Sequence, residues 1–249
     1  MRWFRLTIAY DGTAYTGWQL QPGSATVQGV LEEALRRITG SAVRITASGR
    51  TDSGVHALGQ VASFACDTHL APEAMCRALN ANTPEDIQVR EVREAAEGFH
   101  AIRDAVAKRY RYVIQDGSHR DVLARRYCWH IPQRLDAGSM RAGAAHLVGT
   151  HDFRSFQAAG APRKTTVRTV SDVRVARIRG PASDPIAVEV EADGFLYNMV
   201  RNIVGTLVLV GRGRKPATWV AEVLAGRDRA LAGPTAPARG LTLLEVRYE

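Results

Sequence analysis

The residues best suited to chemistry stand together in one short stretch, Ser48-Gly49-Arg50-Thr51-Asp52-Ser53-Gly54-Val55-His56. Gly49 and Gly54 allow the backbone to turn there and to approach a ligand closely. Arg50 stands two residues before Asp52, so a guanidinium is available to keep that carboxylate ionised in a partly dry site. The stretch therefore predicts a loop that presents an anionic carboxylate. An Asp that caps its own backbone in a tight turn would leave the same pattern.

The triplet Asp52-Ser53-Gly54 also matches the D-[ST]-G motif of aspartic proteases. Those enzymes need two carboxylates close enough to share a proton. The sequence has no second such triplet, and a neighbouring arginine would oppose proton sharing. The protease class is therefore disfavoured.

A second candidate is Arg201, which falls within a strongly apolar helix predicted over residues 195–211. A helix that is apolar nearly all round is typical of a protein core. An arginine on it is costly unless it is paired, so Arg201 should meet a carboxylate or a phosphate. Two partners fit: a structural ion pair with Glu189 or Glu191 on the preceding strand, or Asp52.

A third candidate is Tyr110, within Lys108-Arg109-Tyr110-Arg111-Tyr112. On a strand the two tyrosines share one face and the two arginines the other. Aromatic rings stack on bases and guanidinium groups meet phosphates, so this pattern suits a nucleic-acid surface. Two core tyrosines beside solvated arginines would produce the same sequence.

Hydrophobic periodicity predicts the elements that must position these residues. In the first half it predicts strands at 3–10, 42–48, 58–66 and 86–94, and helices over 26–39 and from Pro72. The first helix is amphipathic and stops at Gly40, with Glu32, Glu33, Arg36 and Arg37 facing away from its apolar side. The order in this half is β-α-β-β-α-β.

The second half repeats that order with one additional helix. The pattern predicts strands at 107–115, 166–178, 186–192 and 241–248, and helices from Asp136 to Gly149, over 195–211 and over 216–225. The Gly- and Pro-rich segment 227–240 is predicted to be a loop. We therefore predict an α+β fold made of two tandem ferredoxin-like α/β halves, residues 1–104 and 105–249. They would form one extended, mostly antiparallel sheet with helices on one face.

The charge balance indicates the class of partner. The 249 residues include 33 Lys+Arg and 25 Asp+Glu, a formal net charge of +8, and all but three of the basic residues are arginine. Arginine fits phosphate bidentately, so a phosphate-rich partner is the first hypothesis. Compositional drift from lysine to arginine would leave the same counts. No apolar run approaches the ~20 residues that span a bilayer, and the N-terminal residues do not predict a signal peptide.

Cysteine and histidine spacing gives no support for metal chemistry or a disulfide framework. The three cysteines, Cys66, Cys76 and Cys128, are odd in number and far apart. The seven histidines show no H-x-x-x-H or H-E-x-x-H spacing. Reduced thiols, and hence a cytoplasmic location, fit best.

Four blocks, taken together, resemble the tRNA pseudouridine synthase A family. They are Tyr10-Asp11-Gly12-Thr13 with Gly17-Trp18-Gln19, then Gly49-Arg50-Thr51-Asp52-Ser53-Gly54-Val55-His56-Ala57, then Arg109-Tyr110-Arg111-Tyr112, then Met199-Val200-Arg201-Asn202-Ile203-Val204-Gly205. They occur in the family's order and span essentially the whole chain. Ser53 stands where the family usually has Ala, and Asn198 where it often has His; neither difference removes a charged group.

The resemblance implies isomerisation of uridine to pseudouridine at positions 38, 39 and 40 of the tRNA anticodon stem-loop, after the base is flipped out. It implies that Asp52 is the essential carboxylate and nucleophile, that Arg201 is its basic partner, that Tyr110 stacks on the uracil and that Arg50 binds the substrate. It implies no cofactor and no metal, and a homodimer with tRNA as partner and no membrane. The main alternative is a tRNA chaperone without chemistry, which the intact set of Asp52, Tyr110 and Arg201 disfavours.

Overall fold

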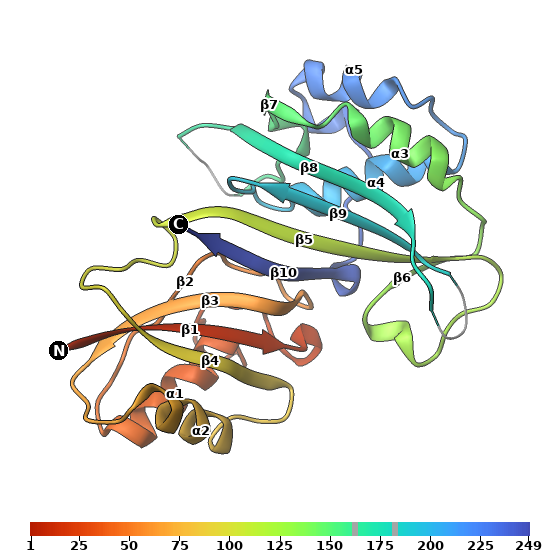
Figure 1. Ribbon diagram of the computed structural model, residues 1–249. Helices are drawn as coiled ribbons and strands as arrows, with labels where there is room; N and C mark the ends of the chain where they lie inside the picture. Colours follow the sequence, from red (N-terminus) through yellow and green to blue (C-terminus); the bar gives the residue numbers. More distant parts are fainter. Residues whose placement is uncertain (161–163, 181–183) are drawn as a thin grey trace. The chain divides into compact units, whose positions relative to one another are not determined.

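The computed structural model describes residues 1–160, 164–180 and 184–249. The chain divides into two compact units: Met1–Val106 with Thr242–Glu249, and Ala107–Leu241. Five α-helices and mostly antiparallel strands make up the described residues (Figure 1). The predicted α+β class with mostly antiparallel pairing is confirmed. No helix among the described residues is long and apolar enough to cross a membrane.

The first unit follows the predicted β-α-β-β-α-β order. Its elements are β1 (Arg2–Tyr10), α1 (Val27–Thr39), β2 (Thr46–Ala47), β3 (His56–Cys66), α2 (Pro72–Ala81) and β4 (Ile87–Ala95). β4, β1, β3 and β2 pair antiparallel in that order, and both helices lie on the same side of the strands (Figure 1). Alternate β1 side chains, Phe4, Leu6 and Ile8, are fully buried and form the core of this unit.

Local signals explain how α1 begins and ends. Thr26 accepts a hydrogen bond from the Gly29 N–H at the start of the helix, and Gly40 ends it with a left-handed φ of 72°. The expectation that Glu32 faces away from the packed side is wrong. Its carboxylate accepts hydrogen bonds from the Ile45 N–H at 2.9 Å and from Gln28 at 2.8 Å. The predicted strand at 42–48 is correspondingly reduced to Thr46–Ala47.

The second unit holds more elements than the sequence predicted. They are β5 (Ala105–Asp116), β6 (Trp129–Ile131), α3 (Ala137–Ala145), β7 (Gly149–Asp152), β8 (Val167–Arg177), β9 (Ile186–Ala192), α4 (Met199–Gly211) and α5 (Trp219–Gly226). β5, β9, β8 and β7 pair antiparallel in that order, and α3, which contacts β8, also contacts α4. β6 and β7 are short strands that the periodicity did not predict.

Two boundaries in the second half differ from the prediction. Helix α4 begins at Met199 rather than near 195, because Asn198 takes a left-handed φ of 59° that interrupts a helix. The last strand, β10 (Leu241–Tyr248), pairs parallel with β3 at its start, and Thr242–Glu249 belong to the first unit. The predicted division at 104/105 had placed this strand in the second half.

Candidate active site

Asp52 lies on the loop between β2 and β3 of the first unit. The Val55 N–H donates to the Asp52 carbonyl at 3.1 Å, and Gly54 takes a φ of +76°, which closes a tight turn around the aspartate. Asp52 is half-buried and Arg50 is exposed. The residues around Asp52 therefore form a loop, as predicted, and the Asp52 side chain is neither enclosed in the core nor fully solvated.

The chain between β1 and α1 packs directly against this loop, through two glycines. A Cβ on Gly12 would lie 2.0 Å from the Val55 carbonyl oxygen, and a Cβ on Gly17 would lie 2.6 Å from the Thr51 carbonyl oxygen. The backbone N–H of Trp18 donates to that same Thr51 oxygen at 3.0 Å. Only a residue without a side chain permits these backbone approaches. The first motif block therefore sets the path of the backbone on both sides of Asp52.

Buried side chains add directed hydrogen bonds to this packing. The Tyr10 hydroxyl lies 2.7 Å from the Thr51 Oγ1, and burial raises the pKa of Tyr10 to about 12, so the phenol stays neutral. The Gly12 N–H donates to the buried His56 ring at Nδ1, 3.1 Å away. At the other end of the loop, Gln60 donates to the Gly49 carbonyl at 2.9 Å. The aspartate is thus carried on a segment anchored at both ends.

Tyr110 lies on β5 of the second unit and is 8% exposed. Its ring meets Phe195 edge-on, with centroids 5.0 Å apart. Tyr112, two residues on, is completely buried and donates its hydroxyl to the Pro237 carbonyl at 2.7 Å. Burial raises the pKa of Tyr112 well above its usual range. Tyr112 is therefore a core residue, as the structural alternative expected.

The two arginines that alternate with these tyrosines pair with acidic residues of the neighbouring strand. Arg109 stands opposite Glu191 on β9 and Arg111 opposite Glu189, with the Nε atoms 2.9 and 2.8 Å from the carboxylates. These arginines therefore pair with the two carboxylates that the sequence analysis had offered as structural partners for Arg201. Cross-strand pairs of opposite charge stabilise a sheet modestly.

Arg201 and its neighbours on α4 hold the segment 229–240. The Arg201 Nε donates to the Ala236 carbonyl at 2.7 Å, and one terminal nitrogen donates to the Asn198 Oδ1 at 2.8 Å. Asn202 is fully buried and accepts hydrogen bonds from Arg229 at 3.0 Å and Thr235 at 2.7 Å. The polar side chains of Arg201 and Asn202 on this apolar helix thus anchor a loop.

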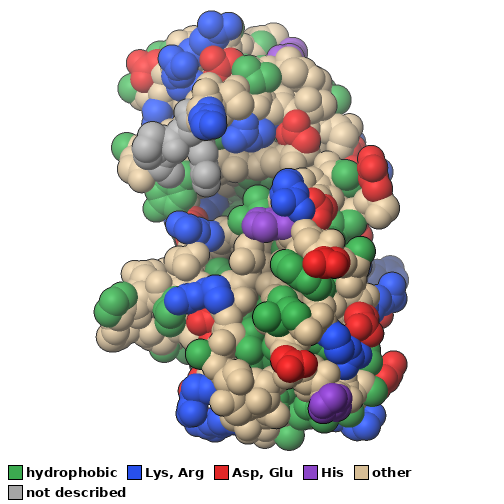
Figure 2. Space-filling view, turned by 90° about the vertical axis from the view of Figure 1, so that its left-hand side faces the viewer, with side chains coloured by type: hydrophobic (Ala, Val, Ile, Leu, Met, Phe, Trp, Pro, Cys, Tyr) green, Lys and Arg blue, Asp and Glu red, His purple; other side chains and the backbone are tan. Residues whose placement is uncertain are grey.

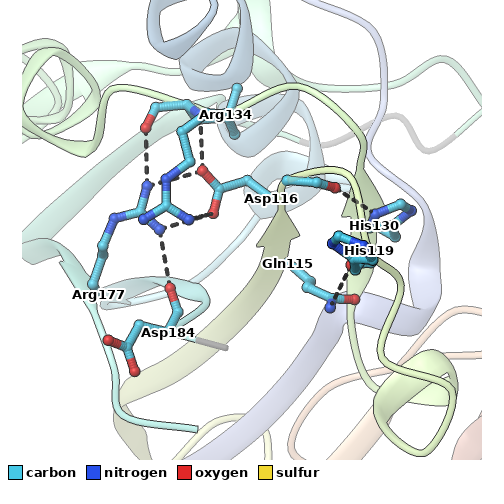
Figure 3. Close-up of polar contacts among 9 residues, drawn as sticks. Gln115, Asp116, His119, His130, Arg134, Arg177 and Asp184 are labelled. Carbon is cyan, nitrogen blue, oxygen red and sulfur yellow. Dashed lines mark hydrogen bonds and ion pairs between the residues drawn. The ribbon is translucent and has the colours of Figure 1, made fainter. Parts of the chain in front are cut away.

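The second unit contains a buried carboxylate, Asp116, whose hydrogen-bond partners were not predicted from the sequence (Figure 3). Asp116, at the end of β5, accepts two hydrogen bonds from Arg177 at 2.8 Å each and one from the Leu135 N–H at 2.8 Å. Burial by itself would raise the pKa of Asp116, but these donors outweigh it and hold the pKa below its usual range. Arg177 lies 61 residues after Asp116 in the sequence, on a different strand, so no local motif marks this pair.

Surface charge gives less guidance than the composition suggested. On the face that Figure 2 shows, Lys and Arg side chains lie among Asp and Glu side chains rather than in one continuous patch. The net charge of +8 therefore does not by itself mark an RNA-binding face on this side. Contacts with a phosphate partner must be argued from particular residues.

Comparison with known proteins identifies the class. A profile of the family described as tRNA pseudouridine synthase matches residues 6–102 and 144–249. The chain is 45% identical over 248 residues to tRNA pseudouridine synthase A of Geotalea daltonii, covering 100% of both chains. It is 48% identical over 246 residues to that of Moorella thermoacetica, covering 98% of both, and 46% identical over 244 residues to that of Myxococcus xanthus, covering 98% of this chain and 91% of the other.

Matches of this extent, over both units, define an isomerase. The chain belongs to the tRNA pseudouridine synthase A family. The resemblance carried by the four motif blocks is confirmed. Asp52-Ser53-Gly54 is accordingly part of this family's loop and not an aspartic-protease motif.

Proposed function

We propose that this protein converts uridine to pseudouridine at positions 38, 39 and 40 of the tRNA anticodon stem-loop, with the Asp52 carboxylate as the essential group. The observation that carries the proposal is the half-buried Asp52 on a loop whose backbone is fixed by Gly12, Gly17 and Trp18. Catalysis requires a group held in place before the substrate arrives, and this loop has that property.

The reaction is an isomerisation. The bond between the ribose C1′ and the uracil N1 breaks, the uracil turns, and C1′ forms a bond to C5. The proton on C5 is lost and N1 gains one, so atoms and electrons balance without a redox cofactor. Asp52 acts either by adding to the ribose C1′ or by helping to remove a ribose proton to give a glycal; both routes need the ionised carboxylate.

Three further residues take roles that the family resemblance assigns. Arg201 is the basic group that keeps Asp52 anionic, and Tyr110 stacks on the uracil and assists proton removal from C5. Arg50, exposed two residues before Asp52, binds the phosphate or fills the space that the flipped nucleotide leaves. Extrusion of a stacked base costs a few kcal/mol, which contacts from arginine to the RNA backbone offset.

The same proposal covers the partners and the setting of the enzyme. It acts as a homodimer on tRNA, without a metal or a cofactor. Its three cysteines are free, as reduced thiols in the cytoplasm would be.

The direct test is to map pseudouridine in tRNA that lacks modifications, after incubation with the purified protein. We expect new pseudouridine at positions 38, 39 and 40 and nowhere else. Pseudouridine confined to another region of the tRNA would overturn the assigned positions. Binding of tRNA without any pseudouridine would instead favour a non-catalytic tRNA chaperone.

A further inference from the structure

The first unit contains an open groove of about 500 Å³ beside the Asp52 loop. Its walls come from the segment that leads into α1, the first turn of α1, the chain from Arg44 through β2 to Arg50, and the loop before β5. The residues that line it are Trp18, Gln19, Leu20, Gln28, Arg44, Ile45, Thr46, Ala47, Arg50 and Ile102. Because Arg50 belongs to both, the groove begins two residues from the proposed catalytic aspartate.

Two polar side chains of α1 tie the segment before α1 and the segment before β2 to this helix. Gln28, which is 2% exposed, accepts from the Leu20 N–H at 3.0 Å and donates to the Ile45 carbonyl at 3.2 Å. Gln28 also donates to Glu32, which accepts from the Ile45 N–H at 2.9 Å. These bonds tie both segments to one helix, so the groove is formed before any ligand binds.

The lining combines apolar surface with positive charge. Leu20 is 41% and Ile102 54% exposed, which is high for large apolar side chains. The described residues that line the groove include two arginines and no acidic side chain. Arg44 lies 3.3 Å from Glu32, whose side chain is 15% exposed, but the arginine side chain is itself 66% exposed. The guanidinium is therefore accessible to a phosphate from the solvent side of this pair.

We propose that this groove binds a nucleotide of the substrate RNA that neighbours the target uridine, with its base or ribose against Leu20 and Ile102 and its phosphate on Arg44. The inference rests on the proposed function, since it takes RNA as the substrate and Asp52 as the reacting group. A nucleotide matches the lining in both respects: it has a planar, largely apolar face and an anion beside it. Arg44 then contributes to substrate affinity rather than to the chemical step.

The first test compares Arg44→Ala with Arg37→Ala. Both arginines have exposed side chains and form an ion pair with a glutamate of α1, but Arg37 pairs with Glu33 and does not line the groove. For Arg44→Ala we expect the tRNA Kd and KM to rise about fivefold. The slope of log affinity against log salt concentration should fall in magnitude by about 1, as for the loss of one phosphate contact. Arg37→Ala should change neither. Equal Kd values for the two variants would overturn the inference.

The second test places opposite charges at one position. Leu20→Glu and Leu20→Lys remove the same apolar contact, but only the glutamate repels phosphate and neutralises Arg44. We expect tRNA binding by Leu20→Glu to be at least about tenfold weaker than by Leu20→Lys at low salt, with the gap closing as salt rises. Thermal unfolding of both variants establishes that they are folded, and equal affinities of folded variants would contradict the inference.

The inference about the groove and the proposed function are tested by different measurements. Affinity for tRNA is measured by binding alone, whereas the function is measured by pseudouridine formation in the wild-type protein. Wild-type conversion with unchanged affinity in the Arg44 and Leu20 variants would overturn only the groove. Absence of wild-type conversion would overturn the function, whatever the variants bind.

Discussion

Two carboxylates, Asp52 in the first unit and Asp116 in the second, are held in opposite ways. The Asp116 side chain is 1% exposed, and both of its oxygens accept hydrogen bonds from Arg177 (Figure 3). Asp52 is half-buried, and the contacts that fix its segment are made largely by the backbone of Thr51 and Val55 and by the glycines that pack on them. Side-chain hydrogen bonds thus hold Asp116, and main-chain contacts of neighbouring residues position the segment that carries Asp52.

Under the proposed function, Asp116 is a structural carboxylate and Asp52 a chemical one. A buried carboxylate with its hydrogen-bonding capacity filled contributes to the fold and has little left for a substrate. The backbone contacts at Thr51 and Val55 position the segment that carries Asp52, as the proposed catalytic role requires. Changes at the two sites should therefore affect different measurements.

The largest effect on stability is expected for Asp116→Asn. This change leaves the Arg177 guanidinium without its anionic partner, and breaking a buried ion pair in this way typically costs about 3–5 kcal/mol. Urea denaturation measures the free energy of unfolding directly. Asp52→Asn should lower this free energy much less, because Asp52 is only half-buried. Similar losses in both variants would remove the distinction.

The next effect is expected for Gly12→Ala. The added methyl would lie 2.0 Å from the Val55 carbonyl oxygen, so the Asp52 loop must move. We expect an unfolding cost of about 1–3 kcal/mol, and turnover that falls by up to about a hundredfold, since a displacement of about 1 Å can misplace a catalytic group by that much. Gly194→Ala is the control, because its methyl would meet Arg168 at an ordinary 3.5 Å. Full activity in a folded Gly12→Ala protein would show that the loop position does not matter.

A smaller effect is expected for Tyr10→Phe, which removes the hydrogen bond to Thr51. A typical intramolecular hydrogen bond contributes about 0.5–1.5 kcal/mol, and the lost restraint on Thr51 should also lower kcat. Tyr15→Phe is the matched control, because it removes a hydrogen bond from the Tyr15 hydroxyl to Asp86 at 2.6 Å. Stability measurements should find the two variants alike, and kinetics should find only Tyr10→Phe slower. Equal kcat values would remove Tyr10 from the positioning of Asp52.

The smallest effect is the pH dependence of the contribution that Asp116 makes to the free energy of unfolding. This dependence reflects only the shift in the pKa of Asp116 between the unfolded and the folded state. The folded-state pKa lies below the ordinary value of about 3.9, so this contribution is fully present above that pH. It is lost as the pH falls through the folded-state pKa. The difference in unfolding free energy between wild type and Asp116→Asn should accordingly narrow below about pH 4. A constant difference down to about pH 2 would show that the ionised carboxylate is not its source.

Sequence patterns predicted the parts of the fold that local forces determine. The strand at 186–192 and the helix between Thr26 and Gly40 follow from periodicity and capping, and Asp136 caps α3 by accepting from the Gly138 and Ser139 N–H groups. β7 was not predicted, because a strand of four residues depends on its pairing with β8. The role of Glu32 was also missed, since its acceptance from Ile45 is set by tertiary contacts and not by helix periodicity.

The same limit applies to the site. The Asp52 loop was recognisable because glycines, an arginine and an aspartate occur together in one stretch. The need for glycine at positions 12 and 17 was not recognisable. Each of these glycines contacts a backbone carbonyl far away in sequence, Gly12 at Val55 and Gly17 at Thr51. The partners of Arg201 and Asp116 are also distant, at Ala236 and Arg177, which are 35 and 61 residues away in sequence, and no local signature marks them.

The most direct test of the central claim, that the Asp52 carboxylate carries the reaction, is tritium release from tRNA labelled at uracil C5. The comparison is between wild type and Asp52→Asn, with thermal unfolding and tRNA binding measured on the same preparations. Asn keeps the size of the side chain but cannot ionise. We predict tritium release by wild type and none above background by Asp52→Asn, with folding and tRNA binding retained. Release at the wild-type rate by the folded variant would contradict the claim.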